Sequence, residues 1–137
     1  MHVQQNPLFR LISARDDNGR TALHWACSGG HKEIVQWLVE NGSEIDARDD
    51  SRWTPLIIAA SAGHEAIVRL LIGRGANINA CTDQGRSALL YASSRNRLPI
   101  VKLLVNEGAD VNLQARKPGL FFCTLDSIFT LLTFLKN

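Results

Sequence analysis

Hydrophobic and polar positions recur along the chain with a fixed period. Three segments begin at Asp16, Asp49 and Thr82 and align with one another without an insertion. The segments are therefore evenly spaced along the chain. The aligned positions that carry the same apolar or small residues are Leu23, Leu56 and Leu89, then Ala26, Ala59 and Ala92, then the pairs Ile34-Val35, Ile67-Val68 and Ile100-Val101. A sequence pattern that recurs at a constant spacing indicates one supersecondary unit that is repeated and stacked several times.

Each unit predicts a turn followed by a first helix of about two turns. A hydroxyl residue precedes each first helix, where its oxygen can accept from an unpaired backbone N–H group, at Thr21, Thr54 and Ser87. Pro55 follows its cap at the first helical position, which needs no N–H donor. Residue types that tolerate a left-handed backbone stand just after each helix, at Gly30, Gly63 and Asn96.

A second, longer helix completes each unit. In the first unit its apolar positions are 34, 35, 37, 38 and 39, and the equivalent positions of the second and third units are apolar as well. This spacing makes a wide apolar face on a helix. A glycine then ends the helix in each unit, at Gly42, Gly75 and Gly108. Because so short a helix pair cannot bury its own face, the units are expected to stack into an all-α solenoid.

The motifs of these units resemble the ankyrin repeat. Thr54-Pro55-Leu56, Gly63-His64 and the run from Gly75 to Asn79 match its defining positions, and the resemblance extends from residue 16 to about 115. It implies three ankyrin repeats of helix-turn-helix form at residues 16–48, 49–81 and 82–114. Departures from the pattern are Ile57 and Leu90 where the first unit has His24, and Arg52 where a turn glycine is usual.

Both ends of the chain depart from the repeat. Residues 1–15 are too short for a full repeat, so they are expected to form a partial N-terminal cap. Residues 115–137 are expected to form a hydrophobic tail outside the repeats, since most positions from 120 to 135 carry Leu, Phe, Ile or Cys. Three interpretations of the tail stay open: a C-terminal cap, a segment foreign to the family as in a truncated or alternatively spliced product, or a membrane anchor, for which it is short.

Composition narrows the classes of partner. Fifteen basic and thirteen acidic residues give a net charge of +2, too small a surplus to favour nucleic acid or an anionic membrane. Three cysteines are an odd number, which argues against a closed disulfide framework. The segment from Met1 to Ser13 does not have the pattern of a secretion signal. The chain is therefore expected to be reduced and intracellular. We also expect a monomer that resides in the cytoplasm and nucleus.

Candidate chemistry is sparse. His24, Cys27 and His31 lie close enough together to suggest metal ligands. The equivalent positions carry Ile57, Ala60 and His64 in the next unit, so the first set is better explained as repeat scaffold. The Asp49-Asp50 pair is likewise explained as turn chemistry. No phosphate-binding loop or nucleophile motif is present, and we expect neither an enzyme nor a bound metal or cofactor.

The positions that the repeat leaves free are predicted to line a concave face. Arginine, tryptophan and tyrosine are enriched in interface hot spots, and this row carries all three. The predicted partner-binding residues are Asp17, Asn18, Arg20, Trp25, Asp50, Ser51, Trp53, Asp83, Gln84, Arg86, Tyr91 and Arg95. Tyr91 is placed there because it shares a helix position with Trp25 and Ile58. The alternative is a solvated row of turns in which Trp53 packs on its neighbour.

Within the ankyrin family, the run from Arg20 to Ser28 and the Trp53-Thr54-Pro55-Leu56 segment are similar to members that chaperone assembly of the proteasome regulatory particle. The resemblance implies a protein-interaction scaffold that binds the C-terminal domain of a proteasomal AAA ATPase. It also implies that Arg20, Trp25, Asp50, Trp53 and Arg95 contact this domain, and it makes a cyclin-dependent kinase a further candidate partner. The alternatives are a truncated product with weak or no binding, or a general ankyrin regulator of a kinase or transcription factor.

Overall fold

A computed structural model describes residues 6–111 of the chain. Its described part is all-helical and contains no named strand. The helices in chain order are α1 (Pro7–Ser13), α2 (Ala22–Gly29), α3 (Lys32–Glu40), α4 (Pro55–Ala62), α5 (Glu65–Gly73), α6 (Ala88–Ser94) and α7 (Leu98–Asn106). This arrangement confirms the expected all-α solenoid.

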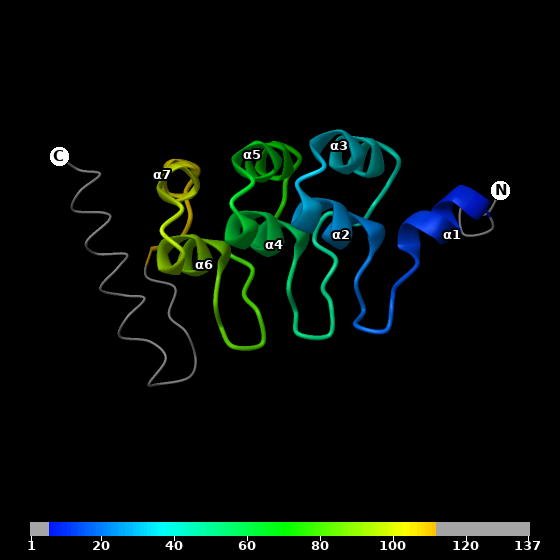
Figure 1. Ribbon diagram of the computed structural model, residues 1–137, viewed down its shortest axis with the longest axis horizontal. Coiled ribbons are helices and arrows are strands. Elements are labelled where there is room, and N and C mark those ends of the chain that lie inside the picture. Colours follow the sequence, from blue (N-terminus) through cyan, green and yellow to red (C-terminus); the bar gives the residue numbers. More distant parts are fainter. Residues whose placement is uncertain (1–5, 112–137) are drawn as a thin grey trace.

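The helices form two layers (Figure 1). The inner layer contains α2, α4 and α6, and the outer layer contains α3, α5 and α7, each packed on its neighbours within the layer and on its partner across it. Before each helix pair the chain extends into a turn finger, and these fingers lie side by side (Figure 1). We number the fingers by their turns, at 16–20, 49–53 and 82–86.

The predicted helix boundaries are confirmed at both ends of the first helices. The hydroxyl oxygens of Thr21, Thr54 and Ser87 each accept from a backbone N–H three residues later. Pro55 is the first residue of α4. The residues expected to adopt a left-handed backbone do so, with φ of 77° at Gly30, 90° at Gly63 and 59° at Asn96. Local sequence therefore determines where each helix starts and stops.

The apolar positions that recur from unit to unit form one continuous core between the two layers. Leu23, Leu56 and Leu89 of the inner helices are buried, as are Val35, Val68 and Val101 of the outer helices. The helices that carry these side chains pack on helices of the neighbouring units. The burial of each contributes about 1.5–3 kcal/mol, and it stabilises the array only while the units stay stacked.

The two ends differ in what the structure describes. At the N-terminal end, α1 lies next to α2 and buries Ile12, while Leu11 is 71% exposed. Residues 115–137, and with them the three interpretations of the tail, lie outside the described residues. No helix among the described residues is both long and apolar enough to cross a membrane.

Candidate functional site

The surface predicted as concave is built from the three fingers and the inner helices, and we call it the finger face. Backbone hydrogen bonds join the finger tips: Asp50 N donates to Asn18 O and Asp83 N donates to Ser51 O, each over 3.0 Å. Arg52 adopts a left-handed backbone, with φ of 64°, where a turn glycine is usual. These hydrogen bonds hold the three tips next to one another at one edge of the finger face. Each tip carries an exposed aspartate, at Asp17, Asp50 and Asp83.

A buried aspartate organises the second finger. Asp49 Oδ1 accepts from the backbone N–H groups of Ser51 and Trp53, each over 2.9 Å. Its other oxygen accepts from Arg20 Nε over 3.2 Å, and Asp49 is only 7% exposed. Asp16 makes the matching pair of backbone hydrogen bonds in the first finger. The acidic pair at 49–50 thus belongs to turn chemistry, as the sequence predicts.

Arg20 and Trp25 are held together on the finger face. The Arg20 guanidinium lies 5.3 Å from the centre of the Trp25 ring, within range of a cation–π interaction. The Trp25 indole N–H donates to Asp16 Oδ2 over 2.9 Å. Backbone N–H groups, chiefly that of Arg20, and the Trp25 indole hold the pKa of Asp16 below its usual value. Trp25 remains 52% exposed, so its ring is fixed in place and accessible.

Tyr91 corrects one part of the prediction. It is 8% exposed and packs against Trp53 of the preceding unit, with ring centroids 4.5 Å apart. Ile58, in the same column, is buried as well. Within the described residues no finger precedes the one at 16–20, so Trp25, the first member of the column, stays exposed. The expectation of an outward column is therefore wrong for Ile58 and Tyr91, because cover from the preceding unit cannot be read from the position within a repeat.

The other predicted partner-binding residues lie at the surface. Arg20, Trp53 and Arg86 are half-buried, and the exposed ones are Asp17, Asn18, Trp25, Asp50, Ser51, Asp83, Gln84 and Arg95. The Arg86 guanidinium lies 5.8 Å from the centre of the Tyr91 ring. The structure thus brings arginines from the first and third fingers and from the end of α6 to one surface.

A depression of about 220 Å³ lies in the middle of this surface. Arg20 and Arg95 contribute its cationic groups, and Trp53 and Ile58 contribute apolar surface. Ser28, Ser61 and Ala62 complete the lining. Sequence reasoning missed the two serines, whose only signal is their position at the ends of first helices. Two guanidinium groups beside an apolar patch suit a partner side chain that ends in a carboxylate.

The histidine and cysteine positions of the first unit have structural roles. His24 is buried and bonds to Thr21 and to the carbonyl of Trp53, as expected of a residue of the repeat scaffold. Burial raises the pKa of the Cys27 thiol to about 12, so it is protonated at neutral pH. His31 is exposed at the start of α3. Among the described residues no group of three or more potential ligands is arranged to hold a metal ion.

Models of known protein families match the repeated helix pairs of this chain. A model of the ankyrin repeat matches residues 18–50, and a model of three ankyrin repeats matches residues 41–115. The chain belongs to the ankyrin-repeat family. Ankyrin repeats serve as protein-interaction scaffolds, and proteins built from them are typically not enzymes.

Individual relatives match shorter segments of this ankyrin-repeat chain. The human 26S proteasome non-ATPase regulatory subunit 10, gankyrin, is 50% identical over 36 residues, which are 26% of this chain and 16% of that protein. The mouse protein gives the same values. An acyl-CoA-binding domain-containing protein 6 homolog from Dictyostelium discoideum is 51% identical over 35 residues, 26% of this chain and 12% of that protein. The matched segment thus spans about one-sixth or less of these relatives.

Proposed function

We propose that this scaffold binds the C-terminal domain of a proteasomal AAA ATPase through the finger face, as a chaperone of regulatory-particle assembly in the cytoplasm and nucleus. The observation that carries the proposal is the row of Arg20, Arg86 and Arg95 beside the aromatic rings of Trp25 and Trp53. The local similarity to a proteasome regulatory subunit gives the partner class.

The arginine row is suited to an acidic partner surface. Among the described residues neither Arg86 nor Arg95 forms an ion pair, whereas Arg20 is already bound by Asp49. A guanidinium presents two parallel N–H donors to a carboxylate, a geometry that lysine does not copy. The two unpaired arginines are therefore available to partner carboxylates, and Arg20 is oriented in advance.

The tryptophans supply the apolar part of the contact. Trp25 is fixed by Asp16 and Arg20, and Trp53 is fixed by its packing on Tyr91. Rigid aromatic side chains cost little conformational entropy when they are covered, so they are effective anchors. Asp17, Asp50 and Asp83 at the finger tips would face basic groups at the rim of the same partner, where charges chiefly affect association rate and specificity.

The test is titration calorimetry of the full chain against the isolated C-terminal domain of the ATPase at two salt concentrations. The variant in which Arg86 and Arg95 are changed to Glu, and Arg20 to Gln so that no second carboxylate faces Asp49, should lose binding while its helical spectrum is unchanged, since none of the three is a core residue. The matched control changes three exposed cations of the outer layer, Arg69, Arg74 and Lys102, to Glu and should bind as the unmodified chain does.

The outcomes separate the candidate functions. Unchanged affinity in the finger-face variant would contradict the assignment of the surface. An unmodified chain that does not bind the ATPase domain would favour the truncated product, or a general ankyrin regulator whose partner is a kinase or a transcription factor.

A further inference from the structure

Arg52 occupies a strained position in the turn of the second finger. The three fingers share one turn geometry, in which the backbone N–H of the fourth turn residue donates to the carbonyl of the first, over 3.0 Å at Gly19, 2.9 Å at Arg52 and 2.9 Å at Gly85. The fourth residue has a left-handed backbone in every turn, with φ of 76°, 64° and 74°. Glycine is the usual residue there, because an L side chain is strained at positive φ. The second finger therefore carries a strain that glycine spares the other two.

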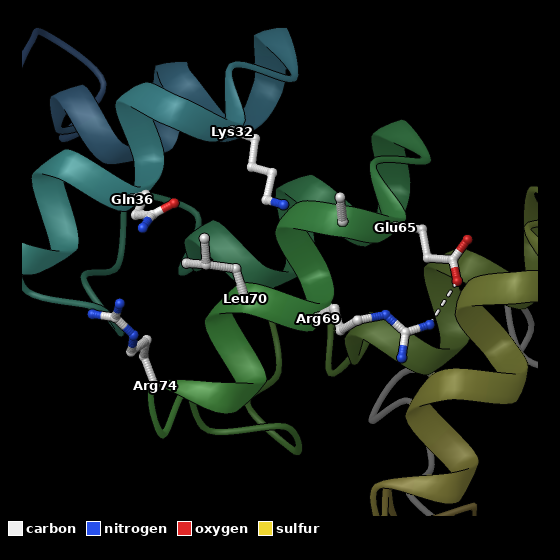
Figure 2. Close-up of a pocket in the computed structure, with 7 residues that line it drawn as sticks. Lys32, Gln36, Glu65, Arg69, Leu70 and Arg74 are labelled. Carbon is white, nitrogen blue, oxygen red and sulfur yellow. Dashed lines mark hydrogen bonds and ion pairs between the residues drawn. The ribbon is translucent and has the colours of Figure 1, made fainter.

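No polar contact among the described residues offsets this strain. Arg52 is exposed, and within residues 6–111 its guanidinium forms neither a hydrogen bond nor an ion pair. Arg69 of the outer layer is a contrasting case, since Figure 2 shows it directed toward Glu65 of the same helix, to which it donates over 2.9 Å. The charge of Arg52 is thus free for a contact outside the chain. Strained residues of this kind cluster at binding sites and switch regions.

Arg52 also distinguishes the tip of the second finger by its charge. We define the tips as residues 17–19, 50–52 and 83–85. Each tip carries one exposed aspartate, and Arg52 is the only basic residue among the three tips. The acidic edge of the finger face therefore contains one cation, on its middle finger.

This single cation removes an ambiguity that a repeated surface creates. The tip aspartates have the same place in successive fingers, so basic groups of a partner can pair with them in more than one alignment, each shifted by one finger. A partner carboxylate that faces Arg52 in one alignment faces an acidic tip without a cation in the shifted ones. Repulsion between like charges disfavours those alignments. Arg52 can thus select one alignment of the partner.

We propose that Arg52 is a specificity-determining residue of the finger face, which binds a carboxylate of the partner and so fixes how the partner is aligned along the three fingers. The inference rests on the proposed function, because it requires a partner on this face. A guanidinium can hold a carboxylate through two parallel N–H donors. Such a contact accounts for an arginine where glycine would be less strained.

The first experiment measures stability and affinity in the same variants. Arg52→Gly should raise the Tm by about 1–4 °C, since it removes the strain, and should weaken binding to the isolated C-terminal domain of the ATPase about twofold to fivefold. Arg52→Asn also tolerates a left-handed backbone and should weaken binding equally, which excludes turn flexibility as the cause. Arg69→Gln is the matched control for lost charge, because it removes a cation of the outer layer, and it should bind as the unmodified chain does.

The second experiment tests the alignment. The double variant Arg52→Gly with Gln84→Arg moves the cation to an exposed position of the third tip at unchanged net charge, and it should not recover the lost affinity. Arg52→Glu should weaken binding about tenfold. A panel of ATPase domains, in each of which one surface carboxylate is replaced by Lys, should contain one variant that restores binding to Arg52→Glu.

Each outcome has one meaning. Unchanged affinity in Arg52→Gly, full recovery when the cation is moved to the third tip, or a panel without a rescuing variant would overturn this inference and leave the proposed function in place. A lower Tm in Arg52→Gly would overturn it as well, because Arg52 would then serve the stability of the chain itself. If the unmodified chain does not bind the ATPase domain, the proposed function and this inference are both wrong.

Discussion

His24 joins the first repeat to the second through one hydrogen bond, in which its Nε2 bonds to the backbone carbonyl of Trp53 over 2.9 Å. Its other ring nitrogen, Nδ1, accepts from the backbone N–H of Thr21 over 3.0 Å. Since Nδ1 accepts, the proton of the neutral ring resides on Nε2, which donates to the carbonyl. The buried ring thus satisfies the cap of α2 and the second finger at once.

The first prediction concerns the stability that this ring contributes. His24→Ile, which installs the residue found at the equivalent position 57, should lower the free energy of unfolding by about 1–3 kcal/mol, because a buried N–H and a buried carbonyl lose their partner. Urea denaturation followed by circular dichroism measures the change. The exposed His31 of the same unit is the control, and His31→Ala should change stability by less than about 0.5 kcal/mol. Equal effects at the two histidines would contradict the role of the buried one.

The second prediction is a loss of stability in mild acid. Burial lowers the pKa of His24 below its usual value of 6.5, so the unfolded chain binds a proton that the folded chain resists. Stability is therefore fully present above pH 6.5 and falls between 6.5 and the lowered pKa of the folded state. The free energy of unfolding should be smaller at pH 5 than at pH 7.5. The difference between the two pH values should be smaller in the His24→Ile variant than in the unmodified chain. An identical pH dependence in the two proteins would mean that another group is responsible.

How far the sequence determines this structure depends on the range of the interaction. Thr54 and Pro55 start α4, and Gly63 ends it, because caps and left-handed positions depend on a few consecutive residues. The burial of Tyr91 could not be predicted in this way, because it is covered by Trp53, which belongs to the preceding repeat. A position within a repeat predicts a side chain's environment only when both neighbouring units are present.

The exposed end of the outer layer illustrates the same limit. Ile34 has the same place in the repeat as Ile67, and periodicity alone assigns both to the core. Only the arrangement in space shows that the helix which buries Ile67 has no described counterpart for Ile34. The candidate residues on the finger face are likewise predictable as positions, whereas the depression between Arg20 and Arg95 depends on the packing of three units.

The third prediction compares two glycines that both have a left-handed backbone. Gly30 has φ of 77°, and a Cβ there would lie 2.7 Å from Cε1 of the His64 ring. Gly42 has φ of 95°, and a Cβ there would meet nothing within 4 Å. Gly42→Ala should therefore cost only the backbone strain, about 1 kcal/mol, and Gly30→Ala should cost more because it also displaces a ring that bonds to Ser28 O. Thermal unfolding of the two variants measures the difference, and equal losses would show that the ring moves aside freely.

The fourth prediction distinguishes two roles of Asp49: its hydrogen bonds to the backbone of the second finger and its ion pair with Arg20. Asp49→Ala removes the acceptor of two backbone N–H groups and leaves Arg20 without its carboxylate, so it should destabilise the chain by about 2–4 kcal/mol. Asp49→Asn keeps an oxygen for the two N–H groups and should lose less. Both variants free Arg20, which should therefore reorient and weaken binding at the finger face even where the finger itself is intact. Denaturation curves and calorimetric titration of the same two proteins give the two readouts. If Asp49→Asn lost neither stability nor affinity, the ion pair with Arg20 would have no part in holding that arginine in position.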